Sequence, residues 1–114
     1  MSNEISHTYD PAPPYGNTLP KMSEKEFDET IKLAIKTFGK ETQTQMLFEE
    51  MAELQNALCK LSRGCASKDD VCEEIADVMI MCLQMAQIYG MKRIEHWADL
   101  KMNRLKERLK GGEK

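Results

Sequence analysis

Apolar residues recur every three to four positions along most of this chain, which is the spacing of helices that bury one face. Gly39, Gly64 and Gly90 separate four such segments, and glycine favours helix ends. No stretch alternates apolar and polar residues for long enough to predict a strand. The pattern therefore predicts an all-α domain, a four-helix bundle over residues 23–110.

Helix starts are marked by capping boxes, in which a side chain at the first position pairs with the backbone three residues later. The three candidates are Ser23-x-x-Glu26, Thr42-x-x-Gln45 and Ser67-x-x-Asp70. The helices that they open should end at Gly39, near Arg63 and near Gly90, and a fourth helix should run from about Lys92 to Lys110.

The two ends of the chain differ from this helical pattern. All four prolines lie within residues 1–22, which predicts an extended arm. The arm could be disordered or could lie across a neighbouring subunit, and the sequence leaves both open. Residues 111–114 are expected to form a flexible tail that begins with two glycines.

The third predicted helix is apolar on nearly all of its faces. Its apolar residues are Ile75, Ala76, Val78, Met79, Ile80, Met81, Cys82, Leu83, Met85, Ala86 and Ile88. Such a helix must be covered on several sides, which four short helices of one small chain cannot easily do. We therefore expect a homodimer or homotetramer with this helix at the interface. Trp97, on the fourth helix, is expected to be a core residue.

Composition narrows the possible classes of protein. A chain of 114 residues with 41% apolar and 31% charged residues fits one globular domain. The net charge of −3 argues against a nucleic-acid polymer as partner, and no segment is long and apolar enough to predict a membrane span. Four cysteines without a C-x-x-C pair, together with two histidines, disfavour zinc and disulfides. The N-terminus lacks the apolar core of a signal peptide, so a cytoplasmic location is expected.

The strongest chemical signal is a motif that occurs twice, 24 positions apart. Residues 47–54 read LFEEMAEL and residues 71–78 read VCEEIADV. Each copy contains two acids three residues apart, Glu50 with Glu53 and Glu74 with Asp77. Residues at i and i+3 share one face of a helix, so each copy presents two neighbouring carboxylates.

If the two helices pack antiparallel, the four carboxylates can converge at the rim of the core. They would repel one another unless a cation lay between them, and oxygen ligands alone suit Mg²⁺, with Mn²⁺ as a substitute. The alternative is that these acids simply line the polar edge of two amphipathic helices. A di-iron site is disfavoured because no histidine lies between His7 and His96, and no EF-hand loop is present.

Basic residues could meet the phosphates that hard cations often accompany. Lys60 ends the second predicted helix, while Lys101 and Arg104 share one flank of the fourth, so all three are candidate substrate-binding residues. They could equally be solvated cations near helix ends. Glu49, beside the first acid pair, is a candidate catalytic base or a solvated neighbour.

The sequences EEMAEL and EEIADV resemble the MazG-like branch of the all-α nucleoside triphosphate pyrophosphohydrolases, over roughly residues 27–109. Dimeric dUTPases and phosphoribosyl-ATP pyrophosphatases look similar, and the proline-rich arm has no counterpart that we can place. The resemblance implies Mg²⁺-dependent cleavage of a nucleoside triphosphate to monophosphate and pyrophosphate. It also implies that Glu50, Glu53, Glu74 and Asp77 hold the metal.

Two other classes of function stay open at this point. The chain could be a non-catalytic interaction or regulatory protein that keeps the fold, although the acidity of all four positions argues against a lapsed enzyme. It could also be a helical bundle that binds or stores metal without hydrolysis.

Overall fold

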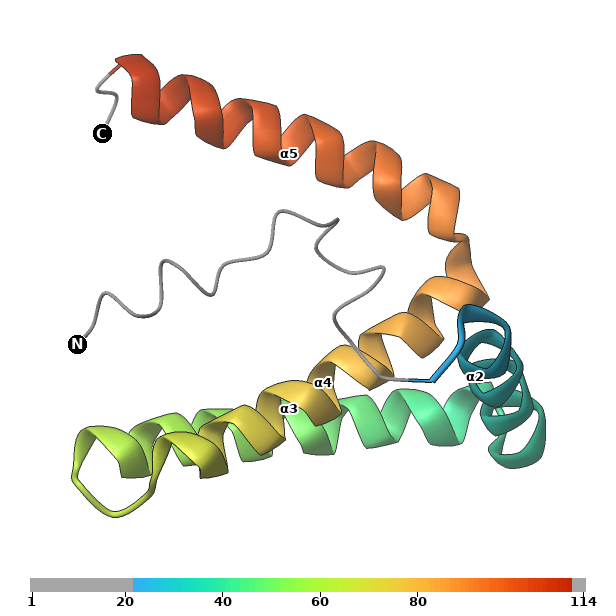
Figure 1. The fold of residues 1–114 in the computed structure, drawn as a ribbon, viewed down its shortest axis with the longest axis horizontal. Helices are drawn as coiled ribbons and strands as arrows, with labels where there is room; N and C mark the ends of the chain where they lie inside the picture. The colour runs from blue at the N-terminus through green and yellow to red at the C-terminus, as the bar shows by residue number, and fades with distance from the viewer. Residues whose placement is uncertain (1–21, 112–114) are drawn as a thin grey trace. The chain divides into compact units, whose positions relative to one another are not determined.

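The computed structural model describes residues 22–111, which form four helices and no strand. The helices are α2 (Glu24–Phe38), α3 (Lys40–Ser62), α4 (Lys68–Tyr89) and α5 (Met91–Gly111) (Figure 1). The described chain divides into two units after Thr30, and the second unit contains α3, α4 and α5. The all-α prediction is confirmed for the described residues. The predicted arm up to residue 21 and the tail from residue 112 lie outside them.

The predicted start of α4 is confirmed in detail. The Asp70 backbone N–H donates to Ser67 Oγ at 3.0 Å, and the Ser67 N–H donates to Asp70 Oδ2 at 2.9 Å. The two bonds form a complete capping box.

The capping box predicted at Thr42 is wrong. Helix α3 begins at Lys40, three residues before the predicted start, and its N-cap residue Gly39 makes no side-chain capping bond. Gly39 has φ +94°, a backbone conformation that other residues rarely adopt, so the chain turns from α2 into α3 within one residue. Thr42 is therefore already inside the helix.

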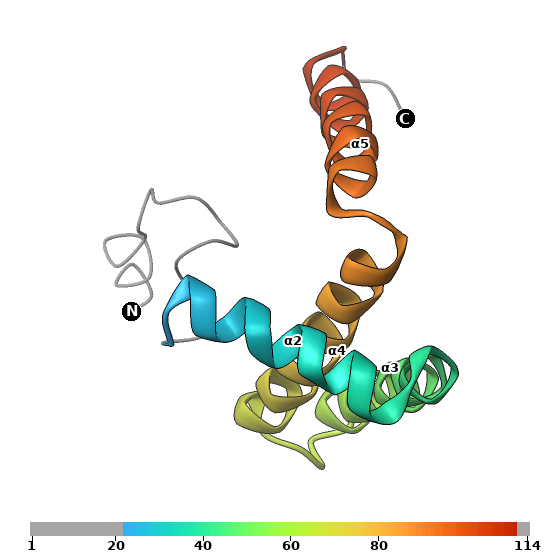
Figure 2. The ribbon, with the colours of Figure 1, turned by 90° about the vertical axis from the view of Figure 1, so that its right-hand side faces the viewer.

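Helices α3 and α4 lie side by side and run in opposite directions, in agreement between Figures 1 and 2. Their buried residues are Gln43 and Ala57 on α3, and Val71, Met81, Gln84 and Ala86 on α4. No large side chain among the described residues is fully buried. The core of one chain is thus thin and includes two glutamines.

A hydrogen bond between these glutamines shows how the two helices are aligned. Gln43 Nε2 donates to Gln84 Oε1 at 2.7 Å. Glu50 follows Gln43 by seven residues, and Asp77 precedes Gln84 by seven. In antiparallel helices this places Glu50 level with Asp77, and, three residues further along, Glu53 level with Glu74. The alignment brings the two copies of the acidic motif face to face.

Helix α5 contacts α4 but not α3. All of its residues are exposed, including Trp97 at 56%, so the expectation of a core tryptophan is wrong for the single chain. Other apolar side chains of this helix are also exposed to solvent: Ile94, Leu100, Met102, Leu105 and Leu109. Of the helices that the structure describes, none combines the length and apolar character needed to cross a membrane.

Candidate active site and metal centre

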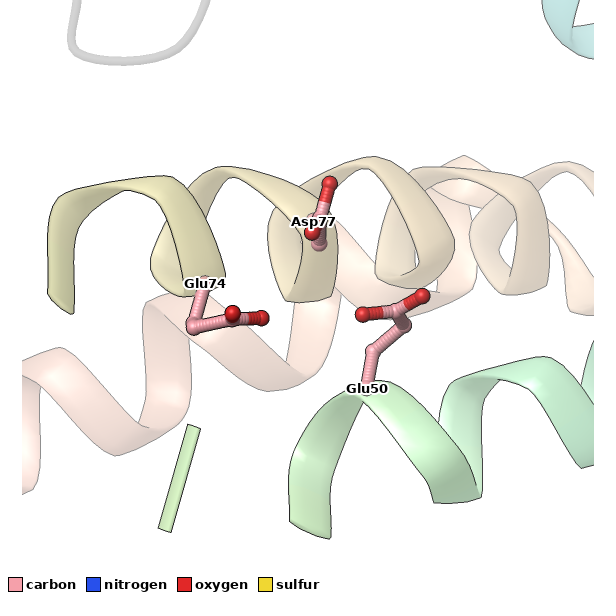
Figure 3. Close-up of side chains that lie close together, drawn as sticks. All are labelled: Glu50, Glu74 and Asp77. Carbon is pink, nitrogen blue, oxygen red and sulfur yellow. The ribbon is translucent and has the colours of Figure 1, made fainter. Parts of the chain in front are cut away.

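Three carboxylates from the two copies of the motif come together between α3 and α4. Carboxylate oxygens of Glu50, Glu74 and Asp77 all lie within 4.8 Å of one another. Figure 3 shows Glu50 extending from α3 toward α4, which carries the other two acids. All three side chains are half-buried. The antiparallel packing of α3 on α4 thus produces the convergence that the duplicated motif predicts.

The electrostatics of this carboxylate cluster are unfavourable without a counter-charge. Partial burial, and then the negative charges of Asp77, Glu53, Glu74 and Glu49, raise the pKa of Glu50 above its ordinary value. Partial burial, and then the charge of Glu53 followed by that of Asp77, raise the pKa of Glu74 as well. Both shifts mean that this environment disfavours the ionised form.

An open groove extends from the cluster toward the loop between α3 and α4. Its volume is about 570 Å³. The lining residues are Ala52, Glu53, Asn56, Ala57, Lys60, Cys65, Ala66, Asp70, Glu73 and Glu74. Among these described lining residues, Lys60 is the only basic one. The groove therefore presents carboxylates together with a single cation.

The segment that contains the carboxylate cluster matches a known protein family. Residues 38–111 match the model of the MazG nucleotide pyrophosphohydrolase domain. The chain belongs to this family. The resemblance found in the duplicated acidic motif is thereby confirmed, and all three clustered acids lie inside the matched segment. No curated protein and no solved structure gave a significant match.

The residues of this MazG domain fit a divalent cation. Glu74 Oε1 is buried and has no hydrogen-bond partner, a condition that a cation or a proton would relieve. The donor set consists of carboxylate oxygens alone, which hard cations such as Mg²⁺ prefer. With Mg²⁺–oxygen bonds of about 2.1 Å, opposite ligands lie ~4.2 Å apart. The spread of the cluster, at most 4.8 Å, is close to that dimension.

The other acids predicted for the site of the MazG domain occupy different positions. Glu53 is exposed and is not one of the three clustered residues, but it lines the groove beside Glu74. Glu49 is exposed, and its charge is the smallest of those that raise the pKa of Glu50. The structure therefore brings together three of the four predicted ligands, with the fourth at the edge of the groove.

The predicted cations separate into two groups. Lys60 lines the groove, whereas Lys101 and Arg104 lie on α5 and border a small surface hollow with Trp97 and Leu100. Neither α5 cation lines the groove beside the carboxylate cluster. Of the three predicted cations, only Lys60 lines the groove that contains the acids.

Sequence reasoning missed several residues of the groove. Asn56 follows Glu53 by three positions, and Asp70 precedes Glu74 by four, so both continue the faces that carry the motif acids. This helical spacing is the sequence feature that could have identified Asn56 and Asp70 as groove residues. The capping pattern predicts a role for Asp70 at the start of α4, which the structure confirms, but not its place in the groove.

Proposed function

We propose that this MazG domain is a divalent-cation-dependent nucleoside triphosphate pyrophosphohydrolase. The observation that carries the proposal is the convergence of Glu50, Glu74 and Asp77 from the two copies of the acidic motif. Membership of a nucleotide pyrophosphohydrolase family supports the same reaction class. Mg²⁺ is the proposed cofactor, with Mn²⁺ as a substitute.

The chain's own residues divide the chemistry among them. Glu50, Glu74 and Asp77 would hold the cation, with Glu53 as an additional ligand from the groove edge. The cation, when bound, neutralises phosphate charge and lowers the pKa of a water molecule. Water oxygen attacks the α-phosphorus, the bond from the α-phosphorus to the bridging oxygen breaks, and pyrophosphate leaves. Glu49 is the proposed acceptor of the water proton.

Lys60 is proposed to bind the phosphates that depart. It lies two helical turns after Glu53 on α3, a separation of about 10 Å along the helix axis. A triphosphate held at the acids and extending along the groove would bring its terminal phosphates toward this ammonium group. A positive charge there would stabilise the charge that develops on pyrophosphate.

A second copy of the chain is proposed to complete the assembly. Apolar side chains remain exposed on α3, α4 and α5, for example Phe48 at 55%, Ile80 at 43% and Leu109 at 75%. Exposed apolar surface of this extent is typical of protein interfaces. We propose a homodimer or homotetramer in which Lys101 and Arg104 meet substrate phosphates near a subunit boundary.

The products of the reaction test the proposal. Incubation with a panel of ribo- and deoxyribonucleoside triphosphates and Mg²⁺ should yield the monophosphate and pyrophosphate for at least one substrate. Chromatography separates these products from diphosphate and phosphate. Diphosphate as the main product would contradict the proposed bond cleavage. Cation binding without turnover of any substrate would favour a metal-binding or interaction protein instead.

A further inference from the structure

Two glutamines form a hydrogen-bonded pair between α3 and α4, and the other buried residues of these two helices are apolar. Gln43 and Gln84 are 6% and 5% exposed, and the Nε2–Oε1 distance is 2.7 Å. Gln84 Nε2 also donates to Met81 Sδ at 3.6 Å. A buried amide without a partner is costly, so the pair favours the helix alignment in which the two side chains meet.

That alignment is also the one that the acidic motif needs. Because both copies space their acids three residues apart, one register places Glu50 level with Asp77 and Glu53 level with Glu74. If one helix moved by three residues along the other, a displacement of about 4.5 Å, only one acid of each helix would still lie opposite an acid of the other. This displacement nearly equals the full 4.8 Å spread of the carboxylate cluster. The cluster therefore tolerates little displacement of one helix along the other.

The acids themselves do not favour this register in the metal-free protein. Carboxylate oxygens of Glu50, Glu74 and Asp77 lie within 4.8 Å of one another across the two helices, and like charges at this separation repel. Apolar contacts between helices are weakly directional and allow several alignments. A buried polar pair does not, because every other alignment separates its donor from its acceptor. Single buried amides fix helix register in coiled coils for the same reason.

We propose that Gln43 and Gln84 are positioning residues that set the α3–α4 register and thereby hold the carboxylates of the proposed metal centre in binding geometry. The inference deepens the proposed function and rests on it for the role of the centre. The glutamines do not belong to the carboxylate cluster, whose nearest acids, Glu50 and Asp77, lie about two helical turns from the pair.

The test replaces both glutamines by methionine, which is likewise unbranched and of similar length but lacks the amide. The variant Gln43→Met/Gln84→Met should remain helical by circular dichroism, because both partners are removed together. Its affinity for Mn²⁺, measured by calorimetry, should fall by about tenfold or more. Nuclear Overhauser contacts between methyl groups of α3 and α4 in the metal-free protein should differ from the wild-type pattern. The matched control Gln45→Met/Gln87→Met changes the same residue types at exposed positions, and should alter neither measurement.

A folded double variant that keeps the wild-type methyl contacts and Mn²⁺ affinity would overturn the inference. Should the double variant not fold, Gln84→Glu provides the second test, since its carboxylate still accepts from Gln43 Nε2. It should preserve the wild-type contacts, and a shifted pattern would contradict the role of the pair. Neither readout requires turnover. A wild-type protein that releases no pyrophosphate would therefore contradict the proposed function and leave this test intact.

Discussion

At the scale of single residues, the carboxylate cluster has opposite effects on stability with and without a cation. Glu50 and Glu74 have raised pKa values because partial burial and neighbouring acids disfavour their ionised forms. A cation bound among these carboxylates attracts each of them and offsets their mutual repulsion. Cation binding should therefore stabilise the folded protein, in proportion to its occupancy of the centre.

Replacing Glu50 by glutamine separates these two effects. Glu50→Gln should lower Mg²⁺-dependent turnover by roughly two orders of magnitude or more, because several kcal/mol of charge stabilisation are lost. The same change should raise the melting temperature in EDTA, because one of the mutually repelling carboxylates is gone. Pyrophosphate release and thermal melts with and without Mg²⁺ measure both.

Asp77→Asn should reproduce the loss of turnover, since Asp77 belongs to the same cluster. Glu41→Gln, an exposed change on α3, serves as the control and should leave turnover unaltered. Near wild-type rates for Glu50→Gln at saturating Mg²⁺ would show that the metal lies elsewhere.

At the scale of elements, the N-terminus of α4 matters because this helix carries two of the three clustered acids. Its first turn is held by the reciprocal bonds of Ser67 and Asp70, and Asp70 also lines the groove. The same residue, Asp70, therefore stabilises the start of α4 and forms part of the proposed substrate groove. Helix α3 begins without any side-chain cap, so its start depends on the turn at Gly39.

Removing the cap hydroxyl should destabilise the protein measurably. Ser67→Ala removes the acceptor for the Asp70 N–H and should lower the free energy of unfolding by about 1 kcal/mol. Urea unfolding followed by circular dichroism measures the change. Ser62→Ala, at the end of α3, provides a control because that hydroxyl donates to a carbonyl and caps no N-terminus. Equal losses for both variants would argue against the capping role.

The cap also predicts a dependence of stability on pH. The backbone and side-chain hydrogen bonds of Ser67 hold the pKa of Asp70 below its ordinary value of 3.8. The stabilisation is present above that ordinary value and is lost as the pH falls through the lower pKa of the folded protein. The excess stability of wild type over Asp70→Asn should therefore be constant from pH 7 to about 5 and shrink toward pH 3. An excess that stayed constant down to pH 3 would contradict this origin.

At the scale of the whole molecule, the described residues expose many large apolar side chains and bury few. No residue of α5 is buried, and α4 exposes Ile75 and Ile80 although it is the most apolar helix. These surfaces are the basis for proposing a second copy rather than an isolated subunit.

A charge placed on α4 tests that assembly. Ile80→Glu should split the oligomer or precipitate the protein, because a carboxylate would enter an apolar interface. Light scattering at micromolar concentration measures the mass, with Lys25→Glu on α2 as the exposed control. A wild-type species of 13.1 kDa would rule the assembly out.

The sequence by itself determined the features that depend on neighbours along the chain. The helical class, the glycine turns and the capping box at Ser67 follow from contacts three or four residues apart, as does the placing of each acid pair on one face. The predicted box at Thr42 failed because the turn at Gly39 let the helix start earlier.

Only the tertiary structure decided what depends on the register and rotation of one helix against another. It brought Glu50, Glu74 and Asp77 together and left Glu53 at the groove edge, although the two motif copies look equivalent in sequence. It paired Gln43 with Gln84 and left Trp97 exposed. These outcomes depend on packing between residues far apart in the chain, where each local pattern is compatible with several alignments.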